Sequence, residues 1–137
     1  MLRRSSILLL SLIIAAACER PGATARPVIR QALQGLIAYP GSVQVDVAAG
    51  EDAAQVVLSA PAPIDTVTNW FRNALAKDGW ELQSDVRSAD GSVALSAQKG
   101  QRPLWITFRP NVGASGTTYT MIGAVVDSTQ GRDSTKK

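Results

Sequence analysis

Two short turns in the second half of the chain constrain its fold more than any other feature. Residues 90–91 are Asp-Gly, a strong signal for a two-residue hairpin loop, and residues 100–101, Gly-Gln, suit a second one. A slip of one residue would turn every side chain to the other face, so such loops set the register of their strands. Both loops independently place Val93, Leu95 and Ala97 on one apolar face of an antiparallel meander. The predicted pairs are Ser88–Val93, Val86–Leu95 and Ser84–Ala97 across the first loop, and Ala97–Leu104, Leu95–Ile106 and Val93–Phe108 across the second.

The opposite face of this predicted meander carries a candidate binding surface. If the apolar residues of 104–108 face inward, Trp105, Thr107 and Arg109 face outward. Exposed Trp, Tyr and Arg side chains are typical anchors of binding interfaces. In the alternative arrangement, the first helix or a loop covers this face and Trp105 belongs to the core. The predicted surface comprises Trp105, Thr107, Arg109, Arg87 and, in one register of the last strand, Tyr119, with Asp85 and Ser96 beside them.

A helix and a hairpin are expected before the meander. Apolar residues in 27–38 recur with the spacing of an amphipathic helix, and Pro40-Gly41 would end it. Valines alternate with other residues over 43–47, which predicts a half-buried strand. Residues 50–52 form a turn, and 55–59 return as the second strand of the hairpin.

A second helix and a last strand complete the predicted fold. Asp65 suits the N-cap of a helix over 65–78, and Gly79 suits its C-cap. The last strand is expected over 117–126. The sequence thus predicts an α+β fold, a small antiparallel sheet (a β-hairpin plus a β-meander) packed with two helices, in the order α-β-β-α-β-β-β-β.

The N-terminal segment has the features of a signal peptide. Arg3 and Arg4 form a basic region, residues 7–14 are apolar, and residues 15–17 are three alanines, small enough for a signal peptidase. The uncharged run is shorter than the ~20 residues that cross a bilayer as a helix. A permanent transmembrane helix is therefore the less favoured alternative.

Cys18 follows the three alanines directly, and residues 1–18 resemble the lipobox of bacterial lipoproteins. The resemblance implies that Cys18 is lipidated and becomes the mature N-terminus. It also implies that the chain is anchored to a membrane of the cell envelope, facing the periplasm or the exterior. Ala15 departs from the leucine that the family prefers. Glu19, in place of the aspartate associated with retention in the inner membrane, slightly favours the outer membrane.

The chain divides into four predicted parts: a signal peptide (1–17), a lipid-anchored polar tether (18–26), a single α+β domain (27–126) and a polar, disordered tail (127–137). Over residues 36–108, the Tyr39-Pro40-Gly41-Ser42 stretch and the Gly79-Trp80 pair resemble small uncharacterised bacterial envelope lipoproteins with a helix that ends in Gly-Trp. That resemblance implies a helix packed on a small sheet and carries no catalytic motif.

Composition argues against most enzyme and metal chemistry. The chain has no histidine and one cysteine, which excludes histidine bases, histidine metal ligands, intramolecular disulfides and cysteine-cluster sites. Removing Arg3 and Arg4 with the signal peptide lowers the net charge from +3 to +1, too little for a nucleic-acid-binding domain. Ser96 and Lys99 match a Ser-x-x-Lys motif, but in a strand they would point to opposite faces, roughly 10 Å apart. We expect no cofactor, metal or nucleic-acid partner.

The sequence therefore predicts a non-enzymatic envelope lipoprotein. Its membrane contact is the lipid on Cys18, and its domain binds a protein or another envelope component through one face of the sheet. The alternative is a small-ligand or lipid-binding module with a pocket between helix 65–78 and the sheet. A hydrolase is the least favoured possibility, since no nucleophile–base pair is present.

Overall fold

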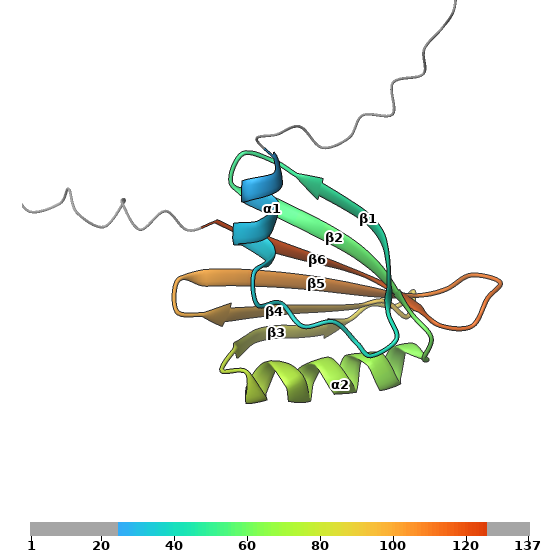
Figure 1. The fold of residues 1–137 in the computed structure, drawn as a ribbon. Helices are drawn as coiled ribbons and strands as arrows, with labels where there is room; N and C mark the ends of the chain where they lie inside the picture. Colours follow the sequence, from blue (N-terminus) through green and yellow to red (C-terminus); the bar gives the residue numbers. More distant parts are fainter. Residues whose placement is uncertain (1–24, 126–137) are drawn as a thin grey trace, which may run out of the picture.

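The computed structural model describes residues 25–125, and these residues form the α+β fold that the sequence predicts (Figure 1). No helix within this range is long and apolar enough to cross a membrane. The elements in chain order are α1 (Ala25–Leu33), β1 (Val43–Ala49), β2 (Ala53–Ala60), α2 (Ile64–Lys77), β3 (Glu81–Arg87), β4 (Val93–Lys99), β5 (Arg102–Pro110) and β6 (Thr117–Ala124).

The six strands form one antiparallel sheet in the order β1-β2-β6-β5-β4-β3. The β1–β2 hairpin and the β3–β6 meander become a single sheet because β6 lies between them. It pairs with β2 from Ala53–Ala124 to Ala60–Thr117, and with β5 on its other side. The central pairing thus joins strands far apart in the chain, which no turn signal specifies.

Both helices lie on the same face of the sheet, which we call the inner face; the opposite face is the outer face. The buried side chains of α2, Val67, Phe71 and Leu75, share one core with the buried residues of the strands. α1 packs against β1, β2 and β6, with Ala32 buried and its carbonyl oxygen directly over Gly123. The outer face is left without a covering element among the described residues.

Aromatic rings fill the layer between α2 and the sheet. Phe71 is completely buried, and its ring centroid lies 5.0 Å from that of Trp70, 5.2 Å from Phe108 and 5.1 Å from Tyr119. These edge-on contacts are the favourable geometry for aromatic pairs. Trp80 is also buried. Phe71 therefore stands at the centre of the core.

The first helix is shorter than the predicted 27–38, since α1 ends at Leu33. Gly35 adopts a φ of 71°, a left-handed conformation that glycine accepts and that stops the helix. Leu36 and Ile37, expected on the helical stripe, lie in the following segment and still pack against the core. The apolar pattern thus predicted correctly that Leu36 and Ile37 contact the core, but wrongly that their backbone is helical.

The ends of α2 show one wrong and one confirmed prediction. Pro63 occupies the N-cap without a side-chain cap, and Asp65, predicted as the cap, lies inside the first turn. At the other end, Gly79 has a φ of 79°, Trp80 N–H donates to the Leu75 carbonyl at 2.9 Å, and Gly79 N–H to Ala76 at 3.2 Å. This is the Schellman arrangement expected of a C-terminal glycine.

The predicted register across the first meander turn is wrong by one residue. β3 and β4 pair Arg87 with Val93 and Asp85 with Leu95, whereas the β4–β5 register is as predicted. Ser88 N–H donates to the Ser92 carbonyl at 2.9 Å, so the loop holds three residues, with Gly91 at a φ of 83°. An Asp-Gly pair fits such a loop as well as a two-residue one. The slip moves Asp85 and Arg87 to the inner side of the sheet.

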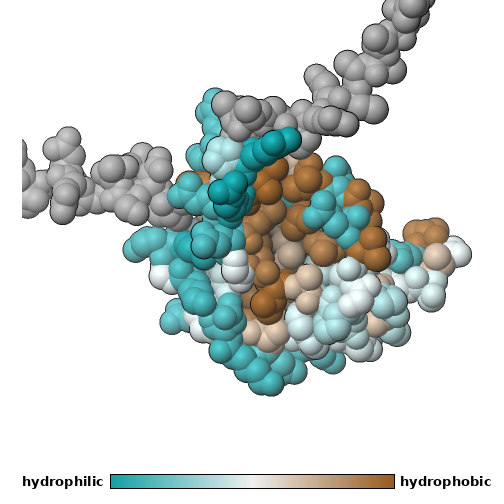
Figure 2. All heavy atoms as spheres, in the orientation of Figure 1, coloured by the Kyte–Doolittle hydropathy of each residue, from teal (hydrophilic) through white to brown (hydrophobic). Residues whose placement is uncertain are grey.

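The edge strand β1 is more exposed than predicted. Its register shifts between Gln44 and Asp46, and Val43 and Val45 are 67% and 63% exposed. Apolar surface is visible beside α1, over the β1 end of the sheet (Figure 2). The alternating valines predicted the strand correctly, but the bulge and the edge position leave two of them in solvent.

Candidate functional site

The outer face of the sheet brings together three of the predicted site residues. Trp105, Thr107 and Arg109 alternate along β5 with the buried Leu104, Ile106 and Phe108. Trp105 is 47% exposed, so it is not a core residue, and α1 packs on the other face. The alternative in which the first helix covers Trp105 is therefore wrong.

The neighbours of these three residues on the outer face are mostly small and polar. Trp105 pairs with Ser96 on β4 and with Ile122 on β6. Thr107 pairs with Ala94 and Thr120, and Arg109 pairs with Thr118. Apart from Ile122, the partners of these three residues thus have short side chains.

A shallow depression of about 430 Å³ lies on this face, and the nearest of its lining residues to Trp105 along β5 is Thr107. Three strands contribute its lining: Gln55 from β2, Thr107 and Arg109 from β5, and Thr118 and Thr120 from β6. Thr118 donates its hydroxyl to Asn111 Oδ1 at 2.7 Å, which fixes its rotamer. The lining consists of three hydroxyls, one amide and one guanidinium, with no carboxylate.

Two predicted surface residues lie elsewhere. Tyr119 is completely buried on the inner face, where its hydroxyl accepts the Tyr39 N–H at 3.1 Å and donates to Ser42 Oγ at 2.8 Å. Arg87 is on the inner side because of the register slip. Both assignments to the binding surface are wrong. Cys18, the predicted lipidation site, lies outside the described residues.

The structure adds Gln55, Thr118 and Thr120 to the site, and the sequence analysis missed all three. Thr118 and Thr120 flank Tyr119, so recognising Tyr119 as a core residue would have placed both threonines outward. Gln55 is brought in only by the β2–β6 pairing. No local sequence signal indicates that contact.

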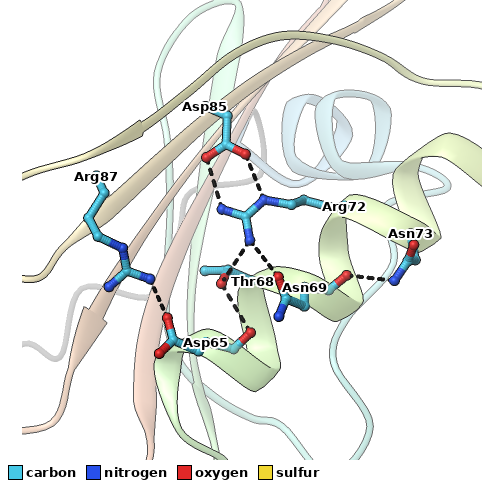
Figure 3. Close-up of polar contacts among 7 residues, drawn as sticks. All are labelled: Asp65, Thr68, Asn69, Arg72, Asn73, Asp85 and Arg87. Atoms are coloured by element: carbon cyan, nitrogen blue, oxygen red, sulfur yellow. Dashed lines mark hydrogen bonds and ion pairs between the residues drawn. The ribbon is translucent and has the colours of Figure 1, made fainter.

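A polar network on the inner side ties β3 to α2 (Figure 3). Arg72 of α2 donates from Nε and Nη2 to both carboxylate oxygens of Asp85, at 2.6 and 2.9 Å. Arg87 forms an ion pair with Asp65 of α2. The network supports the observed register of β3, because the predicted register would turn Asp85 and Arg87 away from the helix.

This network predicts a loss of stability in acid. Hydrogen bonds from Arg72 hold the pKa of Asp85 below its ordinary value of 3.8, and the charges of Arg72 and Arg87 act in the same direction. The ion pair therefore stabilises the fold above that value, and its contribution is lost as the pH falls through the lowered pKa. Asp85→Asn should reduce the free energy of unfolding by up to about 1 kcal/mol near neutral pH.

Urea unfolding of the full chain at about pH 7 and about pH 2 measures this effect. The difference between wild type and Asp85→Asn should shrink at the lower pH. Asp46→Asn is the matched control, since the exposed Asp46 makes no ion pair within residues 25–125. A difference of the same size at both pH values would show that the ion pair does not cause the stabilisation.

The residues of the Ser-x-x-Lys motif are engaged in separate contacts. Ser96 Oγ lies 2.7 Å from Ser84 Oγ, while Lys99 Nζ lies 3.5 Å from Asp78 Oδ2. Within residues 25–125, no three His, Cys, Asp or Glu side chains cluster as metal ligands would. The outer face is therefore the strongest candidate site in the described part of the chain.

Comparison with known proteins assigns the domain to a family. A family model described as START domain-like matches residues 41–130, which include β1 to β6 and α2 and make up about two thirds of the chain. No curated protein and no solved structure matches the chain. Because the matched region spans more than half of the sequence, this chain belongs to the START domain-like family.

Proposed function

We propose that this protein is a lipid-anchored, non-catalytic binding module of the cell envelope. Cys18 carries the anchor, and the outer face of the START domain-like fold contacts a protein or another envelope component. The observation that carries the proposal is the outer face, which no element within residues 25–125 covers and on which Trp105 is half exposed in line with Thr107 and Arg109. A large aromatic side chain in solvent and an arginine on the same sheet face are residue types typical of interface anchors.

The position of the N-terminal end of the domain supports this arrangement. α1 begins at Ala25, which borders the same hollow as Gly50 and Glu51 of the β1–β2 turn. The chain that leads to Cys18 thus enters at one end of the sheet. Arg109 pairs with Thr118, near the opposite end of β5 and β6. An anchor at the first end would leave the depression on the outer face accessible.

A small-ligand or lipid-binding module is the second candidate, and family membership favours it, because START-like domains are generally binding modules. In the structure, the rings of Trp70, Phe71 and Phe108 occupy the layer between α2 and the sheet. A ligand there would have to displace them. Native mass spectrometry of the full chain tests this function: a co-purifying lipid would favour it, and a ligand-free mass would favour the outer face.

In-cell crosslinking of the lipidated protein tests the proposed function directly. Wild type and Trp105→Ala are compared, and the captured molecules are identified by mass spectrometry. We expect a specific captured component that is lost with Trp105→Ala and retained with Arg87→Gln, whose arginine lies on the inner side. Identical capture by wild type and Trp105→Ala would exclude the outer face as the contact surface.

The anchor has its own test. Replacing Cys18 by alanine removes the thiol that would take up the lipid, so we expect an uncleaved precursor to accumulate. Gel mobility and intact mass of the membrane-bound and soluble fractions measure the outcome. Ser5→Ala, within the same N-terminal segment, is the control and should mature normally. A Cys18→Ala chain that matures at the same position would refute the lipobox assignment.

A further inference from the structure

The chemistry of the outer face narrows the class of ligand that it can bind. The depression is lined by the hydroxyls of Thr107, Thr118 and Thr120 and by the amide of Gln55, which both donate and accept hydrogen bonds. Such groups suit a ligand that is itself rich in hydroxyls. They suit a lipid chain poorly, because burying unpaired hydroxyls against hydrocarbon is unfavourable.

Trp105 supplies an apolar platform beside these polar groups. Trp105 pairs with Ser96 on β4, and Thr107 lies two residues further along β5. Because both neighbours have short side chains, the indole is 47% exposed. A sugar ring has an apolar face of C–H groups and a rim of hydroxyls. It can therefore cover the indole while its hydroxyls reach the neighbouring threonines.

Arg109 adds one positive charge at the far side of the depression. Within residues 25–125, Arg109 forms no ion pair. Its charge helps to lower the pKa of Asp90, but the carboxylate of Asp90 accepts its hydrogen bonds from Ser92. A guanidinium binds a carboxylate through two parallel hydrogen bonds. The site as a whole thus complements a hydroxyl-rich ligand that carries a carboxylate.

The spacing of the two anchors sets the size of the ligand. Trp105 and Arg109 share one face of β5 and are four residues apart, or about 13 Å along an extended strand. Thr107 and Arg109 line the depression on the β5 side, and it extends across β6 to Gln55 on β2. A single sugar ring cannot contact both anchors, whereas a short oligosaccharide can.

A second copy of the chain is a weaker occupant of the same face. Face-to-face sheet packing requires a continuous apolar layer. Here, Trp105 and Ile122 form an apolar cross-strand pair, but the next outward-facing residues toward the other end of β5 and β6 are Thr107 and Thr120, so the apolar layer is interrupted. The same interruption disfavours a protein partner with a large apolar interface core.

We propose that the outer face binds an acidic oligosaccharide, with one ring stacked on Trp105 and a carboxylate of the same ligand held by Arg109. This inference rests on the proposed function, because it names the envelope component that the outer face contacts. Thr107 then binds a hydroxyl between the two anchors, and Thr118, Thr120 and Gln55 bind hydroxyls on the β6 and β2 side of the ligand.

Calorimetric titration of the full chain in detergent micelles with the trimer of galacturonic acid tests the proposal. Trp105→Ala and Arg109→Gln should each weaken binding at least about tenfold, since each removes one anchor. Arg87→Gln is the matched control and should bind as wild type does. The methyl-esterified trimer, which lacks the negative charges, should bind wild type about as weakly as the acid binds Arg109→Gln.

Three outcomes would overturn the inference: no binding of the acid trimer at millimolar concentration, equal binding of the acid and its methyl ester, or binding that neither Trp105→Ala nor Arg109→Gln affects. Crosslinking separates this failure from failure of the proposed function. A protein captured through Trp105 without binding of the trimer would leave the proposed function standing. If no component is captured through Trp105 and the trimer does not bind, both the inference and the proposed function are overturned.

Discussion

Phe71→Ala should lower the free energy of unfolding by about 3–5 kcal/mol, a large part of the stability of a typical domain. Phe71 is completely buried between α2 and the sheet and contacts the rings of Trp70, Phe108 and Tyr119. Its removal leaves a cavity that these rigid neighbours cannot fill. Urea unfolding of the full chain, followed by circular dichroism, measures the loss as a lower midpoint at an unchanged slope.

Trp105→Ala is the matched control, because it removes an aromatic side chain from the outer face of the sheet, whereas Phe71 belongs to α2 and packs against the inner face. Trp105 is 47% exposed, so we expect a loss of only about 1 kcal/mol, from its cross-strand contacts. The comparison also shows whether the variant used in the binding experiments folds. A loss as large as that of Phe71→Ala would mean that Trp105 is a core residue and that the outer face is covered.

Gly123→Ala should release α1 from the sheet. A Cβ atom on Gly123 would overlap the carbonyl oxygen of Ala32, which is backbone and cannot rotate away. Either the helix or the strand must shift, at a cost of about 1–3 kcal/mol. We expect a lower urea midpoint and faster hydrogen exchange of the α1 amides, with the α2 amides less affected.

Gly50→Ala is the control for this substitution. Gly50 also has a backbone conformation open to alanine, and a Cβ atom at this position would have the Ala53 carbonyl oxygen as its nearest neighbour, 3.8 Å away. We expect the substitution to be neutral or slightly stabilising, because alanine restricts the unfolded chain. Unchanged exchange of the α1 amides in Gly123→Ala would show that α1 does not depend on this close approach.

Local interactions explain the parts of the fold that the sequence predicted well. The register of β4 and β5, and with it the outward direction of Trp105, Thr107 and Arg109, follows from one short turn and an alternating pattern. The C-terminal end of α2 follows from Gly79, which adopts the left-handed conformation that its Schellman motif needs. In each case, the determining residues lie within a few positions of the feature that they specify.

The register of β3 shows where local information was insufficient. Asp90-Gly91 is compatible with a two-residue and a three-residue loop, and the two choices place opposite faces of β3 against the helix. In the observed register, Asp85 meets Arg72 and Arg87 meets Asp65, both across the gap to α2. These contacts involve residues that the turn itself does not contain, so only the packed structure selects between the loops.

Neighbouring residues alone specify the α+β class, the apolar faces of β4 and β5 and half of the candidate site, because strand alternation and short turns are local. The packing of the whole domain is needed to place both helices on one face, to set β6 between β2 and β5, and to bury Tyr119 while Gln55, Thr118 and Thr120 line the depression. The physical reason is that these outcomes depend on the pairing of distant strands. Each side chain takes its face from a partner that is close in space and remote in the chain.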